Sequence, residues 1–132
     1  TVGRHGARAL NIGLNDEYDA SLVCECEEVS VGEVRYAINE LDVHNLVDLR
    51  RRTRVGMGTC QGELCACRAA GMLADAHKCT ERAKSDLQNF VNERWKGRYL
   101  VWWGGKLRES EYSQWIYSGV CGLEGSETGK TE

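Results

Sequence analysis

Apolar residues recur along most of the chain at the spacing of short amphipathic helices. After Ser30, one such stripe lies at Val34, Ala37, Ile38 and Leu41. Ser30 and Glu33 have the spacing of a capping box, in which each side chain accepts a hydrogen bond from the other residue's backbone amide. We therefore expect a capped helix that begins just after Ser30 and packs against a core.

Two further helices are expected in the next part of the chain. Asn45 and Asp48 form a second cap, which opens a short helix that ends in the basic run 50–54. A glycine-rich loop at 55–59 separates this helix from an alanine-rich one, expected from about Gly62. The capped helix after Ser30 and the helix after Asn45 are therefore expected to form a helix–turn–helix unit that ends in the basic run.

The C-terminal half continues with helical patterns and one aromatic interruption. Thr80 is expected to cap a longer helix with apolar residues on one face. Residues 98–103 are too apolar and aromatic for an ordinary loop, which favours a strand or an extended strap packed across the helices. A last helix is expected over residues 107–118, with Trp115 and Ile116 on its inner side.

The N-terminal residues carry a weaker pattern. Residues 1–14 fit a short helix interrupted by glycines, residues 15–20 a polar linker and residues 22–23 an extended piece. The whole pattern predicts an all-α protein, a small helix–turn–helix domain with a helical C-terminal extension. The expected divisions are a helical remnant and linker at 1–20, the small domain at 21–76, the extension at 77–123 and a disordered tail at 124–132.

Composition limits the class of protein. At 132 residues the chain can bury only a small core. Its 17 basic and 20 acidic side chains give a net charge of −3, which indicates neither nucleic acid nor an anionic membrane as a partner. No apolar run approaches the ~18 residues that a membrane span needs. The first residues lack the apolar core of a signal peptide. They also contain no initiator Met, so a piece of a longer polypeptide is expected.

The candidate chemistry lies in the cysteines. Four of the seven form two close pairs, C-x-C at Cys24 and Cys26 and C-x4-C at Cys60 and Cys65. Four thiolates are the ligand set of a [2Fe–2S] cluster or of a structural zinc ion. Zinc modules favour C-x2-C pairs, so this spacing departs from theirs, but zinc stays open as the alternative. A thiol–disulfide pair at Cys60 and Cys65 fits less well, because such enzymes use C-x-x-C.

The other cysteines are expected to stay outside such a site, in a reduced, cytosolic protein. Cys67 follows Cys65 by two residues, so on one helix the two side chains would point about 200° apart. Cys67 is therefore expected to be a small packed residue, although exchange with Cys65 as a ligand stays open. Cys79 and Cys121 lack close partners in the sequence and are expected to be inert.

Three further features receive structural explanations. The histidines, His5, His44 and His77, are dispersed and form no group that would indicate hydrolysis. The loop at 56–61 lacks the third glycine of G-x-G-x-x-G and follows a helix, so it is no dinucleotide site. The tryptophans are expected to form the core of the extension, or else a docking surface for an absent domain; they are Trp95, Trp102, Trp103 and Trp115.

The arginines of the run 50–54 have two compatible interpretations. Basic side chains at a helix C-terminus are favoured by the helix dipole, so a solvated helix end is expected. They would also offset the negative charge of a bound cluster or dock an acidic partner. A nucleic-acid site is not indicated, because no aromatic residues alternate with the arginines.

Several of these residues together resemble a known family. The cysteines of the C-x-C pair, Val29, Ala37 and the runs LRRRTR at 49–54 and GMGTCQGELC at 56–65 resemble the bacterioferritin-associated-ferredoxin-like [2Fe–2S]-binding domain over about residues 22–75. The runs RHGARA at 4–9 and WGGKLRESE at 103–111 resemble the C-terminal region of the FAD-containing large subunits (the A subunits) of anaerobic glycerol-3-phosphate dehydrogenases. The ferredoxin that names the domain has a shorter second cysteine pair, whereas the dehydrogenase-type relatives have C-x4-C.

The resemblance implies that Cys24, Cys26, Cys60 and Cys65 bind a [2Fe–2S] cluster. It implies an electron-transfer module of an FAD-dependent glycerol-3-phosphate dehydrogenase, with FAD bound by missing sequence and electrons passing towards partner subunits and quinone. Expected partners are the FAD domain of the same polypeptide and other subunits, in the cytoplasm or at the membrane through those subunits. The chain alone is expected to be inactive. The alternative is a structural zinc-binding or subunit-interaction module without a redox role.

Overall fold

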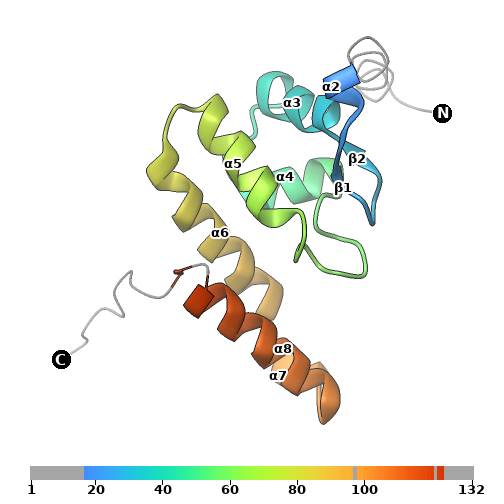
Figure 1. Ribbon diagram of the computed structural model, residues 1–132, viewed down its shortest axis with the longest axis vertical. Helices are drawn as coiled ribbons and strands as arrows, with labels where there is room; N and C mark the ends of the chain where they lie inside the picture. Colours follow the sequence, from blue (N-terminus) through green and yellow to red (C-terminus); the bar gives the residue numbers. More distant parts are fainter. Residues whose placement is uncertain (1–16, 97, 121, 124–132) are drawn as a thin grey trace. The chain divides into compact units, whose positions relative to one another are not determined.

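The computed structural model describes residues 17–96, 98–120, 122 and 123, and these residues are mostly helical (Figure 1). The all-α prediction is confirmed, with one small two-stranded sheet added to it. The chain divides into two compact units, unit 1 over residues 1–90 and unit 2 over residues 91–132. Within the described ranges, no helix combines the length and apolar composition needed to cross a lipid bilayer.

The described part of unit 1 begins with a helical turn, α2 (Glu17–Ala20), where a linker was expected. The prediction was wrong for these residues because their polar side chains find partners in the fold. The carboxylate of Asp19 is buried and lies 2.7 Å from the guanidinium of Arg35. The same guanidinium lies over the ring of Tyr18, 4.9 Å from its centroid. The expected helix at 1–14 lies outside the described residues.

A short hairpin follows, made of β1 (Leu22–Cys24) and β2 (Val29–Ser30). The strands pair antiparallel, with Leu22 opposite Ser30 and Cys24 opposite Val29. Helix α3 (Val31–Glu40) starts directly from β2, and both hydrogen bonds of the predicted capping box between Ser30 and Glu33 are present. The hairpin is thus fixed to the start of α3, which sets where its turn lies.

The second predicted cap is also confirmed. The Asn45 side chain accepts a hydrogen bond from the Asp48 amide at 2.9 Å, and α4 (Leu46–Thr53) starts there. Arg54 ends α4 in the left-handed conformation, with φ of +68°. Helix α5 (Ala66–Ala76) begins four residues later than the expected Gly62, because Gly62 itself has φ of +89° and cannot continue a helix.

Buried apolar side chains from these elements form the core of unit 1. The members with almost no exposed surface include Val34, Val43, Leu46, Leu49, Leu73 and Phe90. Helix α6 (Thr80–Trp95) has Thr80 as its first helical residue rather than as the residue before it. On its apolar face Leu87, Phe90 and Val91 are buried, whereas Ala83 is partly exposed. Part of this core lies against the 54–65 loop, since the Phe90 ring contacts it at Gly56 and Gly62.

Unit 2 differs from the prediction at two places. Residues 98–101 form a helical turn, α7 (Arg98–Val101), instead of a strand or a packed strap, and its Leu100 and Val101 are exposed. Helix α8 (Gly105–Trp115) continues as a π-helical segment, η1 (Ile116–Val120). Trp115 was expected to point inward but is exposed, and Tyr117 is buried instead. The tail at 124–132 lies outside the described residues.

The four tryptophans are all described in unit 2, and Trp95 is the one of them that is buried. Its ring meets that of Tyr117 edge-on, with centroids 6.1 Å apart. Trp103 and Trp115 are exposed and Trp102 is partly exposed. The expectation that all four form the core of the extension is therefore wrong, because apolar partners cover only Trp95.

Candidate metal centre

The β1–β2 hairpin places the first cysteine pair. Cys24 is the last residue of β1 and its side chain is buried, whereas Cys26 lies in the turn and is exposed. Glu28 ends the turn with φ of +53°, which reverses the chain into β2. The two cysteines are thus held on a tight turn at different depths, Cys24 inside and Cys26 at the surface.

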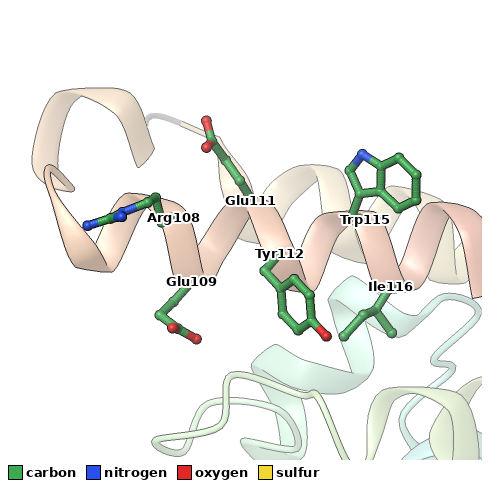
Figure 2. Close-up of a pocket in the computed structure, with 6 residues that line it drawn as sticks. All are labelled: Arg108, Glu109, Glu111, Tyr112, Trp115 and Ile116. Atoms are coloured by element: carbon green, nitrogen blue, oxygen red, sulfur yellow. The ribbon is translucent and has the colours of Figure 1, made fainter.

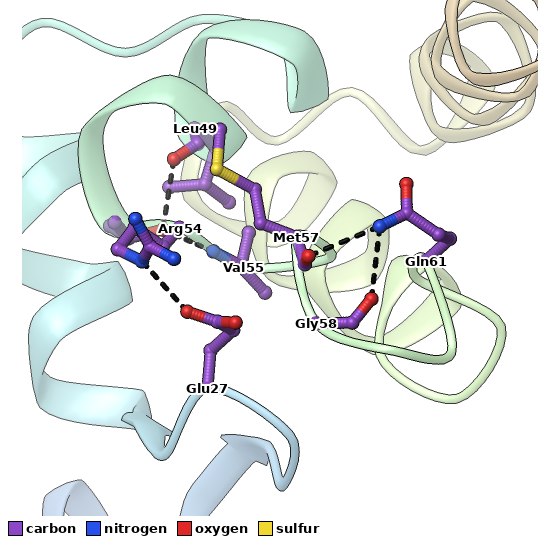
Figure 3. Close-up of polar contacts among 8 residues, drawn as sticks. Glu27, Leu49, Arg54, Val55, Met57, Gly58 and Gln61 are labelled. Carbon is purple, nitrogen blue, oxygen red and sulfur yellow. Dashed lines mark hydrogen bonds and ion pairs between the residues drawn. The ribbon is translucent and has the colours of Figure 1, made fainter.

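The loop between α4 and α5 places the second pair, Cys60 and Cys65. Gln61 holds the loop from within, because its side-chain amide donates to the carbonyls of Met57 at 3.1 Å and Gly58 at 3.0 Å (Figure 3). The Gln61 carbonyl oxygen accepts a hydrogen bond from the Arg50 guanidinium at 3.2 Å. One glutamine therefore fixes the loop's shape and connects it to the end of α4.

Close packing requires glycine at two points of this loop. A Cβ at Gly58 would lie 2.3 Å from the Cβ of Cys26, so the loop approaches the hairpin turn as closely as a backbone can. A Cβ at Gly62 would lie 2.5 Å from the ring of Phe90, which lies against this part of the loop. Glycine at Gly58 lets the loop bring Cys60 next to Cys26.

The structure brings the four predicted cysteines together as two pairs. The Sγ atoms of Cys26 and Cys60 are 3.5 Å apart. Two thiolates on one tetrahedral metal ion, with bonds of about 2.3 Å, would be about 3.8 Å apart. Cys24 lies close enough to Cys65 to raise the pKa of its thiol, and so does the charge of Cys60. Each pair combines one cysteine of the hairpin with one of the loop.

Backbone amides point at the sulfur of Cys60. Burial raises the pKa of this thiol, but the N–H groups of Leu64, Gly62 and Glu63 and the Cys26 thiol stabilise the thiolate, so the net pKa lies below its ordinary value. These amides come from the three loop residues 62–64, which precede α5. A site that stabilises a thiolate suits a metal ligand.

Cys65 has the opposite electrostatic character. Burial, the hydrogen bond with Cys24 and the charges of Cys24 and Cys60 raise the pKa of Cys65 to about 12, although the Gly56 amide lowers it. At neutral pH this thiol keeps its proton until a metal ion replaces it. The buried Cys24 and Cys65 can therefore both carry negative charge only when a cation lies between them.

Two arginines hold the hairpin turn from outside. The Arg68 guanidinium donates to the carbonyl of Val23 at 3.2 Å and to the carboxylate of Glu25 at 2.7 Å. This ion pair holds the pKa of the exposed Glu25 carboxyl below its usual range. The Arg54 guanidinium contacts the carboxylate of Glu27 at 2.7 Å (Figure 3). The residues on either side of Cys26 are thus each tied to an arginine from a later element.

The remaining candidates fall outside the cluster of sulfurs. Cys67 is on α5 and is exposed, so it is not the packed residue that was expected; Cys65 before it is buried, which agrees with side chains pointing apart. Cys79 is partly exposed between α5 and α6. His77 lies 3.1 Å from the Val43 carbonyl, and His44 lies 2.9 Å from Asp42. His5 and Cys121 are not among the described residues.

Sequence reasoning missed three residues that shape the site, Gln61, Arg68 and Phe90. Gln61 lies inside the GMGTCQG run, where a long amide side chain between glycines was a usable signal. Arg68 and Phe90 act on the site from α5 and α6, and no local spacing connects them with it. In the described part of the chain, no three Cys, His, Asp or Glu side chains are placed to hold one metal ion.

Comparison with known proteins identifies the domain. The sequence model of the BFD-like [2Fe–2S] binding domain matches residues 22–75, which contain the four cysteines and both arginine anchors. The donor set fits such a group, because four thiols are present as two pairs and backbone amides point at one of the sulfurs. No solved structure matches the chain significantly.

Longer relatives match nearly the whole chain. It is 56% identical over 124 residues to the A subunit of anaerobic glycerol-3-phosphate dehydrogenase of Escherichia coli (strain K12), covering 93% of this chain and 23% of that protein. For the A subunit of the Haemophilus influenzae enzyme the identity is 54% over 123 residues, covering 92% and 22%. For the A1 subunit of the Haloferax volcanii enzyme it is 32% over 115 residues, covering 87% and 19%.

The chain therefore spans about a fifth of the length of these relatives. The matched family model accounts for the hairpin, α3, α4, the cysteine loop and most of α5. The likeness to the dehydrogenase A subunits continues beyond that domain into the C-terminal part of the chain. Residues 22–75 of this protein are a BFD-like [2Fe–2S] binding domain, in a chain similar to a segment of the A subunit of anaerobic glycerol-3-phosphate dehydrogenase.

Proposed function

We propose that this chain is the electron-transfer module of an anaerobic, FAD-dependent glycerol-3-phosphate dehydrogenase. Its [2Fe–2S] binding domain supports an electron-transfer role. The observation that carries the proposal is that two cysteines of the hairpin lie next to two cysteines of the loop, Cys26 beside Cys60 and Cys24 beside Cys65. We assign the four cluster ligands to Cys24, Cys26, Cys60 and Cys65.

The residues around these cysteines suit a bound, negatively charged cluster. The amides of residues 62–64 supply hydrogen-bond donors to the sulfur of Cys60, and such bonds favour added negative charge. Arg54 and Arg68 hold the hairpin turn in position before the cluster binds. When bound, the cluster would supply one-electron transfer.

The two sides of the site differ in access. Cys24 and Cys65 are buried, while Cys26 is exposed and Cys60 is partly exposed. Leu64, an apolar residue beside this edge in the loop, is exposed as well. Electron exchange with a partner is therefore expected on the side of Cys26 and Cys60, where the partner can come close to the sulfurs.

The remaining parts of the proposal follow from similarity to longer proteins. FAD would be bound by the rest of a longer polypeptide, and electrons would pass from it through this domain towards partner subunits and quinone. The chain alone would then have no dehydrogenase activity. We place the assembly in the cytoplasm, with membrane association through partner subunits. The relatives named as A subunits of anaerobic glycerol-3-phosphate dehydrogenase support the assignment to a multi-subunit dehydrogenase.

Metal analysis of the chain purified without oxygen tests the cofactor. Equal amounts of iron and acid-labile sulfide, with visible absorption that bleaches on reduction, are expected. Stoichiometric zinc without sulfide would instead support the structural or subunit-interaction module. A mass loss of two hydrogen atoms on oxidation, without metal, would point to a thiol–disulfide pair, because a disulfide forms with release of two protons and two electrons.

Single serine variants test the ligands. Each of the four assigned cysteines, changed to serine, is expected to lower the cluster content several-fold, because a hydroxyl is a poorer ligand for iron than a thiolate. Cys67→Ser is the matched control, since Cys67 is two residues from Cys65 yet exposed. Full retention by Cys65→Ser, with loss in Cys67→Ser, would show that the two residues have been assigned wrongly.

A further inference from the structure

Unit 2 presents an apolar tip at α7. Leu100 is 90% exposed, Val101 70% and Trp103 84%. Three large apolar side chains this exposed, within four consecutive residues, are far more than the scattered apolar residues of an ordinary surface. Such an exposed apolar stretch indicates a contact surface.

The charge of the surrounding sequence is one-sided. Residues 96–108, called here the tip segment, contain Lys96, Arg98, Lys106 and Arg108 and no Asp or Glu, in a chain whose net charge is −3. Lys106 and Arg108 are exposed on α8. Lys96 is exposed too, and its 3.3 Å pair with Glu93 is a surface pair that water and salt weaken.

The basic stretch ends at α8. Glu109 and Glu111 follow Arg108, and Figure 2 shows these three side chains pointing to different sides of the helix. They line a pocket together with Tyr112, Trp115 and Ile116. This pocket is of mixed charge, so the apolar tip and the basic side chains, rather than the pocket, carry the argument.

We propose that the tip segment binds the surface of a bilayer that contains anionic lipids. Trp103, Leu100 and Val101 would enter the boundary between headgroups and acyl chains, where tryptophan is favoured. Lys96, Lys106 and Arg108 would meet the lipid phosphates. A bilayer surface offers uniform negative charge next to hydrocarbon, which matches a segment with basic but no acidic side chains.

The net charge pointed away from an anionic membrane as a partner. The attraction of an anionic surface falls off within a Debye length, about 8 Å at physiological salt. The charge of the tip segment, rather than the net charge of the chain, therefore determines how strongly the segment is attracted. In the described residues no helix spans a bilayer, and the proposed contact is with its surface only. This contact does not depend on the cluster or on the proposed electron-transfer role.

Sedimentation with lipid vesicles tests the proposal on the 132-residue chain. Vesicles of phosphatidylcholine mixed with phosphatidylglycerol are expected to bind it more than about tenfold more tightly than phosphatidylcholine alone, and added salt is expected to reduce this difference. Lys106→Glu with Arg108→Glu is expected to weaken binding to the mixed vesicles by at least about 25-fold, because each lost basic residue accounts for about fivefold and each new carboxylate is repelled. Trp103→Ala is expected to weaken binding to both kinds of vesicle.

Two variants control for loss of charge and of aromatic surface elsewhere. Lys84→Glu changes an exposed basic residue of unit 1, and Trp115→Ala removes a tryptophan that is 77% exposed but lies outside the tip segment. Both are expected to bind vesicles like the unchanged chain. Since all the substituted side chains are exposed, far-UV circular dichroism of every variant is expected to match that of the unchanged chain.

Three results would overturn the proposal. The first is recovery of the chain in the supernatant with both kinds of vesicle. The second is equal weakening by the control and tip-segment variants. The third is failure of the longer polypeptide to bind vesicles that the 132-residue chain binds, which would show that protein covers the tip. The cluster's visible absorption, followed separately, reports on the proposed electron-transfer role.

Discussion

The guanidinium of Arg54 lies 2.7 Å from the carboxylate of Glu27, and this contact joins the end of α4 to the hairpin turn that carries Cys26. Arg54 also has φ of +68°, a conformation that costs energy for any residue with a side chain. Glycine would adopt this backbone conformation without strain, but it could not make the contact with Glu27.

Arg54→Gly is expected to separate folding from cluster retention. The thermal midpoint should stay equal or rise, because glycine relieves the backbone strain and an exposed ion pair contributes little. Loss of the cluster to a chelator should become several-fold faster, because the turn with Cys26 loses its anchor. Absorbance decay measures this. The control is Arg51→Ala, which breaks the 3.5 Å pair with Asp48 but leaves the hairpin alone; equal decay in both variants would contradict the anchoring role.

Arg68 and Glu25 allow tethering and charge to be told apart. Arg68→Gln and Glu25→Gln both break the 2.7 Å pair, so each is expected to speed cluster loss several-fold. Their effects on the reduction potential should be opposite. Removing the positive charge disfavours the added electron and lowers the potential, whereas removing the negative charge raises it. Redox titration measures both, and shifts of the same sign would mean that the charges act only through structure.

Gly58→Ala is expected to displace Cys26 from Cys60. The new methyl would lie 2.3 Å from the Cβ of Cys26, so the chain should lose most of its cluster and about 1–3 kcal/mol of stability. Gly71→Ala on α5 is the matched control, since nothing lies within 4 Å of its new Cβ. It should raise the free energy of unfolding by about 0.5–1 kcal/mol. Iron content and denaturant unfolding check both. Normal iron content in Gly58→Ala would refute the close approach.

Asp86 is expected to make stability depend on pH. Burial raises the pKa of Asp86, against the opposing charges of Arg82 and His77. The folded state therefore binds this proton more tightly than the unfolded state does. The free energy of unfolding should fall as pH rises from the ordinary pKa of about 3.9 through the folded-state pKa, and then level off.

The uncharged variant Asp86→Asn is expected to remove this fall and to raise the denaturant midpoint at neutral pH. Midpoints from acidic to neutral pH, measured under reducing conditions, give the comparison. Asp75→Asn changes an exposed carboxylate on α5 and should preserve the wild-type slope. If Asp86→Asn keeps the slope as well, another group causes it.

Local sequence rules predicted the elements whose stabilising contacts are made between residues close together in the chain. The Ser30–Glu33 capping box and the Asn45–Asp48 cap involve residues three apart, so local spacing was enough to place the helix starts of α3 and α4. The extended piece at residues 22–23 could be assigned from local sequence as well, and it lies in β1. Predictions failed where a partner lies far along the chain, as for α2, whose Asp19 is paired with Arg35, or where expected packing is absent, as at α7.

The sequence by itself determined the four cysteines, their spacing, the helical class and the resemblance to a [2Fe–2S] binding domain. Tertiary structure alone decided how those cysteines pair, Cys26 with Cys60 and Cys24 with Cys65. It also placed Arg68 and Phe90 beside the site and left Trp103 in solvent. The physical reason is that helix caps and side-chain periodicity are local, whereas close approach, burial and charge depend on segments that only folding brings together.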